Sequence, residues 1–134
     1  MNYSAVFALG AGIVVLIYFA RIYLSRFKLI GEPNPARNIG GESQPWQVFY
    51  FYSPRCGACK KITPAIEEHA KHHEQVNAVD VSTDLALAQK FNIRTTPTVV
   101  FVEKNIVSDV LLGTSALQAI NDFIQAQKNK AGND

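Results

Sequence analysis

Cysteine is scarce in this sequence: its 134 residues include two, Cys56 and Cys59. Two cysteines exclude the multiply bridged scaffolds of small secreted proteins. Their Cys-x-x-Cys spacing remains compatible with one redox-active disulfide or with half of a metal site. The length allows one domain plus an appendage, and a domain of that size can bury enough apolar surface to fold alone.

A broad basic surface is also missing. The formal net charge is +2, but residues 1–30 carry three basic and no acidic side chains, whereas residues 31–134 carry 10 basic and 11 acidic ones. The basic excess therefore belongs to one short flank, and no basic stripe is interleaved with aromatic residues. The electrostatic footprint of a nucleic-acid-binding protein is absent, and we expect no nucleic-acid partner.

Charged residues are absent from Ala5–Ala20, and with its ends the apolar segment covers Tyr3–Leu24. A helix rises about 1.5 Å per residue, so roughly 20 residues cross the ~30 Å hydrocarbon core of a bilayer. A cleaved signal peptide would begin with basic residues and end in small ones, whereas Met1-Asn2-Tyr3-Ser4 has no Lys or Arg and the run ends in bulky and basic residues. We therefore expect residues 1–29 to form a transmembrane anchor with a basic flank.

The basic residues around this segment predict its orientation. Arg21, Arg26, Lys28 and Arg37 all follow the apolar run, and no Lys or Arg precedes it. The positive-inside rule then places the rest of the chain on the cytoplasmic side of a bacterial-type cell membrane. In the opposite orientation the cysteines would lie in a periplasmic or other extracytoplasmic, oxidising compartment, and this alternative stays open.

Composition divides the remainder into three parts. Residues 30–44 are rich in Gly and Pro and have little to bury, so we expect a surface linker. The folded domain is expected at 45–128, and a polar, disordered tail at 129–134. Apolar patterns predict strands at Gln47–Tyr52, Val76–Val81, Thr98–Glu103 and Ile106–Leu112, and helices at Cys59–His73, Asp84–Phe91 and Ser115–Gln127. This order predicts an α/β domain with a mixed sheet between helices.

From Trp46 to Gln127 the sequence resembles the thioredoxin family. Four landmarks stand in the family's order: Cys56-Gly57-Ala58-Cys59-Lys60, similar to Cys-Gly-Pro-Cys-Lys; Pro64, like a helix-kinking proline; Phe91–Thr98, like the cis-proline segment; and Gly113 before a closing helix. The resemblance implies a thioredoxin-like fold with a mixed central sheet flanked by helices. Because little chain is left before Trp46 for the first strand and helix, we expect a fold trimmed at its N-terminus, with at most a short strand around Arg37–Ile39.

The two cysteines are expected to have different roles. Cys56 lies where the predicted strand gives way to a helix, and free backbone N–H groups, the helix dipole and the neighbouring Arg55 favour its thiolate, so we predict that it is the nucleophile. Cys59 lies one turn further and more buried, and is predicted to resolve the mixed disulfide. Gly57 and Ala58 leave the approach unobstructed. The disulfide is itself the redox group, so no separate cofactor is expected.

Pro97 is the second part of the predicted site. The resemblance implies a cis peptide bond that holds the backbone of Thr95 and Thr96 opposite Cys56. A substrate chain could then add edge-on through backbone hydrogen bonds, and Thr96 would touch the cysteines. Taken alone, Pro97 fits better a trans proline at the start of a strand; the other landmarks favour cis.

Three histidines follow on the same predicted helix as Cys59: His69, His72 and His73. Ten residues separate Cys59 from His69, which is about 15 Å along a helix. One helix cannot bring these ligands together with Cys56. We therefore expect no metal site, and imidazoles that suit the dipole at a helix end.

The sequence departs from the family in ways that bear on activity. Arg55 stands where the family usually has tryptophan, Tyr50 replaces a buried acid, and Ala78 or Val79 replaces its lysine partner. In the family that acid is thought to help deprotonate the second cysteine. We therefore expect proton transfer at Cys59 to pass through water, which puts strong general reductase activity in doubt.

The leading hypothesis is a membrane-anchored thiol–disulfide oxidoreductase. It would exchange disulfides with protein partners, in the first place as a reductase, and be regenerated by an upstream thiol reductant or oxidant. The alternative is a non-catalytic, membrane-tethered binding module, or a carrier of copper or zinc on the two thiolates. The missing buried acid keeps that alternative open.

Overall fold

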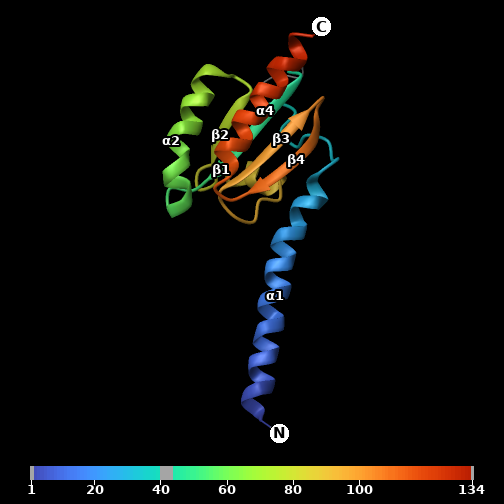
Figure 1. Cartoon of the computed structure of the whole chain (residues 1–134), viewed down its shortest axis with the longest axis vertical. Helices are drawn as coiled ribbons and strands as arrows, with labels where there is room; N and C mark the ends of the chain where they lie inside the picture. Colours follow the sequence, from blue (N-terminus) through green and yellow to red (C-terminus); the bar gives the residue numbers. More distant parts are fainter. Residues whose placement is uncertain (1, 40–43, 134) are drawn as a thin grey trace.

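Residues 2–39 and 44–133 are described in the computed structural model, and their course is shown in Figure 1. The elements are α1 (Tyr3–Leu29), β1 (Trp46–Tyr52), α2 (Gly57–His72), β2 (Val76–Asp80), α3 (Leu85–Lys90), β3 (Thr98–Glu103), β4 (Ile106–Leu112) and α4 (Ala116–Ala131). After the long first helix, this is the predicted order of strands and helices. The predicted thioredoxin-like α/β architecture is confirmed.

The described strands form one mixed sheet in the order β2-β1-β3-β4. β1 pairs with β2 in parallel and with β3 antiparallel, and β3 pairs antiparallel with β4. The central strands read as unbroken apolar runs because both faces of the sheet are covered. Successive side chains of β1 alternate between the faces, so Phe49 and Phe51 pack in one core cluster and Val48 and Tyr50 in the other.

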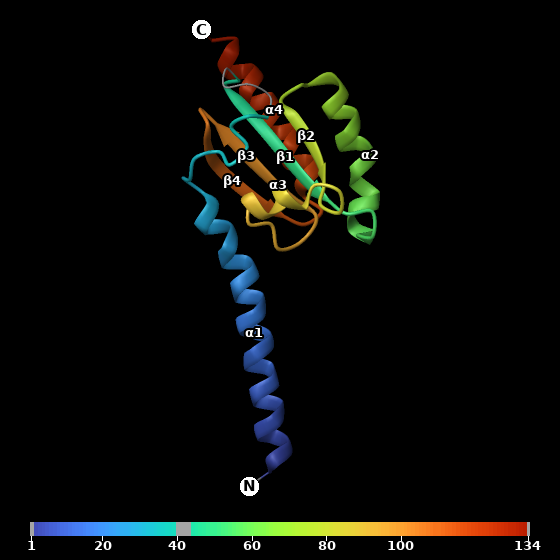
Figure 2. The same cartoon turned by 180° about the vertical axis from the view of Figure 1, so that it is seen from behind.

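Different helices cover the two faces. α2 and α4 place Ile62, Ile66 and Ile120 against the face that carries Tyr50. On the opposite face, seen in Figure 2, α3 and the segment after it pack Leu87 and Phe91 against Phe49 and Phe51. This two-layer burial holds β1 rigidly in the middle of the domain, and the start of α2 lies directly beyond its end.

α1 projects away from the domain over most of its length (Figures 1 and 2). Its most apolar 18-residue window has a mean hydropathy of 2.2, and none of that window is buried within the structure. By length and composition, it is the one helix among the described residues that could cross a membrane. Its last residue, Leu29, is instead buried in the domain core.

The predicted linker is wrong for residues 30–39. The N–H of Gly31 donates to the carbonyl of Val107 (2.8 Å), and the N–H of Val107 donates to Glu32 (2.9 Å). Pro33 forms an isolated bridge with Ile106. This backbone pairing attaches the segment to β4 without an apolar run of its own, which is why composition suggested a free linker.

Two buried residues complete this attachment. Asn34 is 3% and Ala36 4% exposed. The Asn34 side chain donates to Gln47 (2.9 Å) and accepts from the N–H of Ala36 (2.9 Å). The short strand expected around Arg37–Ile39 is also wrong: these residues form turns and a bend, and residues 40–43 lie outside the described residues.

The predicted disordered tail is wrong for residues 129–131, because α4 continues to Ala131. Its last turns are held by Glu103 at the end of β3, which accepts hydrogen bonds from Gln127 and from Lys130, the latter at 2.8 Å. These contacts join residues 24 and 27 positions apart. Local composition therefore could not predict them.

We expect Asn34→Ala to destabilise the full chain by about 1–3 kcal/mol, because it leaves the side-chain oxygen of the buried Gln47 without the donor that Asn34 supplies. Urea unfolding in detergent micelles, followed by the fluorescence of Trp46, measures this change. The matched control is Asn38→Ala, an exposed amide in the same segment, for which we expect a change within about 0.5 kcal/mol. Equal unfolding midpoints for the two variants would show that the segment is a linker after all.

Candidate active site

A tight turn connects β1 to α2 and places the first cysteine. The N–H of Cys56 donates to the carbonyl of Ser53 (3.0 Å), with Pro54 and Arg55 between them. The second position of such a turn favours proline, because the proline ring fixes φ near the value that the turn requires. Cys56 then forms the N-cap of α2, with extended backbone angles, and is partly exposed.

The two cysteines form a disulfide, with their Cα atoms 5.2 Å apart. The backbone N–H of Cys59 donates to Cys56 Sγ (3.2 Å), the position of a capping side chain at a helix start. Cys59 is 1% exposed and packs inside the domain, whereas Cys56 is open to solvent on one side. The predicted difference in exposure is confirmed, and an incoming thiol or disulfide meets Cys56 first.

The segment before β3 faces this disulfide. The Thr96–Pro97 peptide bond is cis, as the resemblance implied. The carbonyl oxygen of Thr96 lies 3.6 Å from Cys56 Sγ. The carbonyl of Pro97 accepts from the N–H of Gly113 (2.9 Å), whose φ of +96° is a left-handed backbone conformation that favours glycine. β4 therefore fixes the segment that contacts the cysteines.

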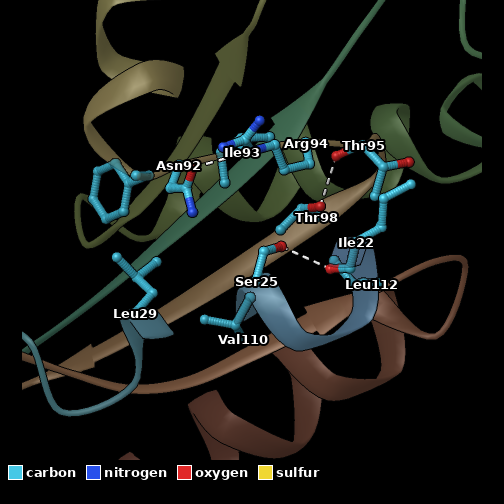
Figure 3. A pocket seen from close by; sticks show the side chains of 11 residues that line it. Ile22, Ser25, Leu29, Asn92, Ile93, Arg94, Thr95, Thr98, Val110 and Leu112 are labelled. Atoms are coloured by element: carbon cyan, nitrogen blue, oxygen red, sulfur yellow. Dashed lines mark hydrogen bonds between the residues drawn. The ribbon is translucent and has the colours of Figure 1, made fainter. Parts of the chain in front are cut away.

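Thr95 also makes contacts away from the cysteines. Its carbonyl accepts from the Thr98 hydroxyl (2.7 Å), and its side chain lines a cleft with α1. Figure 3 shows this cleft, in which Ile22 and Ser25 of α1 face the segment that contains Arg94 and Thr95. The cleft holds about 20 Å³, room for about one water molecule. Of Thr95 and Thr96, it is Thr96 whose carbonyl oxygen contacts Cys56.

A buried hydroxyl pair takes the place of the family's buried acid. Tyr50 is fully buried, and its hydroxyl lies 2.8 Å from that of Thr63. Because Thr63 donates its proton to the carbonyl of Cys59 (2.7 Å), Tyr50 is the donor to Thr63. The sequence analysis missed this network, although Thr63 stands four residues after Cys59, on the same helix face.

The environment of Tyr50 keeps its phenol neutral. Burial raises the pKa of Tyr50 above its ordinary value, and the hydrogen bond with Thr63 opposes that rise only in part. The ring also stacks on that of Tyr52, with centroids 5.6 Å apart. A phenol whose pKa is raised above 10 stays protonated near neutral pH, so Tyr50 cannot supply the negative charge of a buried carboxylate.

Basic side chains flank the cysteine pair in the sequence. Arg55, Lys60 and Lys61 are exposed, and Gly57 has open space where a side chain would stand. Beside α2 an open hollow of about 300 Å³ is lined by Tyr52, Ser53, Pro54, Lys60, Thr63, Pro64 and Asp80. The hollow extends to Thr63, whose hydroxyl donates to the carbonyl of Cys59 (2.7 Å).

The histidines lie at the far end of α2 from the cysteines. His72 contacts Glu68 (3.1 Å), and the rings of His69 and His73 stack 6.5 Å apart. Burial and the nearby positive charge of Lys128 lower the pKa of His73. Within residues 2–39 and 44–133, the structure brings together no group of three or more His, Cys, Asp or Glu side chains that could hold a metal ion.

The thioredoxin family model matches residues 37–126. A chloroplastic M-type thioredoxin of Spinacia oleracea is 36% identical over 87 residues, which are 63% of this chain and 48% of that protein. Protein disulfide-isomerase erp38 of Neurospora crassa is 31% identical over 81 residues, 55% of this chain and 22% of that protein. This chain covers about half the length of the first curated relatives that it matches.

The fold comparison agrees with the sequence comparison. The X-ray structure of Fasciola hepatica thioredoxin matches with a TM-score of 0.55 and 26% identity, over 67% of this chain and 88% of that one. The matched region includes the cysteine turn, the cis-proline segment and the sheet that joins them. On these matches and this geometry, the chain belongs to the thioredoxin family.

Proposed function

We propose that this chain is a thiol–disulfide oxidoreductase that exchanges disulfides with protein partners through Cys56 and Cys59. The observation that carries the proposal is the asymmetry of the pair. Cys56 Sγ is partly exposed to solvent, accepts a hydrogen bond from the N–H of Cys59 and lies 3.6 Å from the carbonyl oxygen of Thr96. Cys59, by contrast, is buried. The relationship to thioredoxins and protein disulfide-isomerases supports the same chemistry.

In the reducing direction, the Cys56 thiolate attacks one sulfur of a substrate disulfide. The substrate S–S bond breaks, a mixed disulfide forms, and the departing substrate thiolate takes a proton from water. Cys59, after losing its own proton, attacks Cys56 Sγ and releases the second substrate thiolate. Two electrons have then passed to the substrate, and an upstream dithiol returns them to the Cys56–Cys59 disulfide.

Three features favour the Cys56 thiolate as the first nucleophile. The N–H of Cys59 points at its sulfur, the dipole of α2 places positive charge there, and Arg55 is adjacent. Gly57 and Ala58 leave its outer side open. The Thr96 carbonyl and the cis Pro97 provide the opposite wall, along which we place the backbone of a substrate segment.

Proton loss from Cys59 is assigned to water rather than to a side chain. The pKa of Tyr50 is raised by burial, and its proton is directed to Thr63. Neither hydroxyl is a base near neutral pH. The open hollow beside Thr63 and Lys60 admits water to this side of α2.

We further propose that α1 anchors the domain as a single-pass membrane protein of a bacterial-type cell membrane, with the domain in the cytoplasm and acting as a reductase. The uncharged run before Arg21 and the exposed, apolar surface of α1 support the anchor. The basic residues that follow it support the cytoplasmic side. In the opposite orientation, the same chemistry would serve disulfide handling outside the cytoplasm.

Replacement of Cys56 by Ser is expected to abolish reduction of insulin disulfides, because the attacking sulfur is lost. Cys59→Ser is expected to accumulate mixed disulfides, seen as thiol-sensitive adducts on non-reducing gels. Thr114→Ser, at an exposed position, is the matched control and should leave turnover unchanged. Turnover that survives in Cys56→Ser, or stoichiometric copper or zinc retained by a chain without exchange activity, would contradict the mechanism.

The rate of exchange in Tyr50→Phe is expected to show the same pH dependence as the parent between pH 6 and 9, because a phenol with a raised pKa does not titrate in roughly that range. Loss of the hydrogen bond to Thr63 is expected to cost about 0.5–1.5 kcal/mol in urea unfolding. If the substitution removes a basic limb from the pH–rate profile, Tyr50 rather than water takes the proton of Cys59.

The side of the membrane can be measured with Cys56 itself. In intact cells that express Cys59→Ser, a membrane-impermeant maleimide is expected to label Cys56 only after the cell membrane is permeabilised. The double variant Cys56→Ser, Cys59→Ser has no cysteine and gives the background. Labelling without permeabilisation would place the domain outside the cytoplasm.

A further inference from the structure

No free linker separates α1 from the domain. Leu29 is buried in the same core cluster as Phe91 and Val110. The two hydrogen bonds that join residues 31 and 32 to Val107 follow immediately. The direction of α1 therefore fixes the orientation of the domain, which cannot rotate freely as it would on a Gly/Ser-rich tether.

The segment before the cis-proline lies level with the point where α1 leaves the apolar region. Charge along α1 begins at Arg21, and Ile22 and Ser25 line the cleft with Arg94 and Thr95 (Figure 3). Thr95 is followed directly by Thr96, whose carbonyl contacts Cys56. The cysteines are thus connected, through this short segment, to the part of α1 that would emerge from a bilayer.

Residues 53–57 and 94–97 together form one edge of the domain, which we call the cysteine edge. In Figures 1 and 2 the start of α2 and the loop before β3 lie on the side of the domain towards which α1 extends, and the β3–β4 turn lies on the opposite side. β3 has six residues, so that turn is roughly 17 Å further along the strand direction. With α1 across a bilayer as proposed above, the cysteine edge would face the membrane surface.

The charges near this edge suit anionic headgroups. Arg55, Lys60 and Arg94 are exposed there, and Arg21 is exposed on α1. Of the nearby acids, Asp80 accepts from the N–H of Ser82 (2.8 Å) and Asp84 from that of Leu87 (3.1 Å); both keep their negative charge, and the four basic side chains outnumber them. Arg55, which replaces the family's usual tryptophan beside the first cysteine, would then carry a charge to headgroup level in a chain anchored by α1.

We propose that the substrates of Cys56 and Cys59 are cysteine pairs of integral membrane proteins, held at the lipid–water interface on the same side as the domain. This inference rests on the proposed function and on the anchor, and it specifies the partner. A disulfide in bulk solvent must enter between the cysteine edge and the membrane. A cysteine pair held at the lipid–water interface is already level with the cysteine edge. It also diffuses in the same membrane plane as this chain, which raises its effective concentration at Cys56.

The geometry is tested with the full chain in vesicles of phosphatidylcholine with some phosphatidylglycerol. A bimane label on Cys56 in Cys59→Ser is compared with one on Lys104→Cys in the cysteine-free background; Lys104 lies in the β3–β4 turn. The readout is quenching by headgroup-attached nitroxide relative to quenching by water-soluble nitroxide. We expect a clearly higher ratio at Cys56. Equal ratios would overturn the proposal.

The substrate class is tested in the same vesicles with two single-span peptides. One carries a disulfide next to its apolar stretch, and the other carries the same disulfide beyond a long hydrophilic spacer. We expect the first to be reduced at least about tenfold faster. A flexible Gly/Ser insertion after Leu29, which frees the domain but keeps the anchor, should remove that preference.

Exchange with glutathione disulfide separates the two proposals. A chain that reacts with glutathione disulfide but shows no preference between the peptides retains the proposed function and overturns this inference. A chain that reacts neither with glutathione disulfide nor with either peptide contradicts both. Reaction of the insertion variant with glutathione disulfide shows that its domain is folded, so that its lost preference reports orientation.

Discussion

The hydrogen bond from the N–H of Cys59 to Cys56 Sγ depends on almost every other part of the domain. It forms because Cys56 caps α2, and Cys56 caps α2 because β1 ends in a proline-containing turn at that point. β1 is held there by apolar contacts on both faces and by two neighbouring strands. An accessible sulfur at a helix start can hold negative charge only if the helix start does not move, and the double-faced core supplies that rigidity.

Behind the pair, a neutral network replaces a charged one. The Tyr50 hydroxyl donates to the Thr63 hydroxyl, which donates to the carbonyl of Cys59, so both hydroxyl protons have an acceptor. Tyr50 itself is fully buried. Its hydrogen bonds secure the first turns of α2, but burial raises the pKa of Tyr50 and removes it as a base. Structural support and proton transfer, which one buried carboxylate could combine, would be separated in the mechanism that we propose, with proton transfer assigned to solvent in the hollow beside α2.

The sequence predicted what local patterns encode. The apolar runs of β1 and β3, the helical spacing of α2 and the cysteine turn were all readable, and the four landmarks together predicted the cis bond at Pro97 that the proline alone did not. What failed was non-local. Residues 31–36 are attached by backbone pairing with β4, and the end of α4 by Glu103, and neither contact has a local pattern. The cleft that Thr95 shares with α1 has no local pattern either, because it depends on where that helix packs against the domain.

The packing of α1 against the domain bears on the function of the membrane anchor that we propose. A transmembrane helix on a flexible tether confines a domain near a membrane but lets it react in any orientation. Here Leu29 belongs to the domain core and residues 31 and 32 bond to Val107, so the helix also sets the direction in which Cys56 faces. In a chain anchored as we propose, partners far from the membrane surface would lose part of the encounters that a flexibly tethered domain allows, whereas partners within the surface would gain them. Specificity among disulfides can thus arise from the angle between one helix and one sheet, with no side-chain pocket that recognises the substrate.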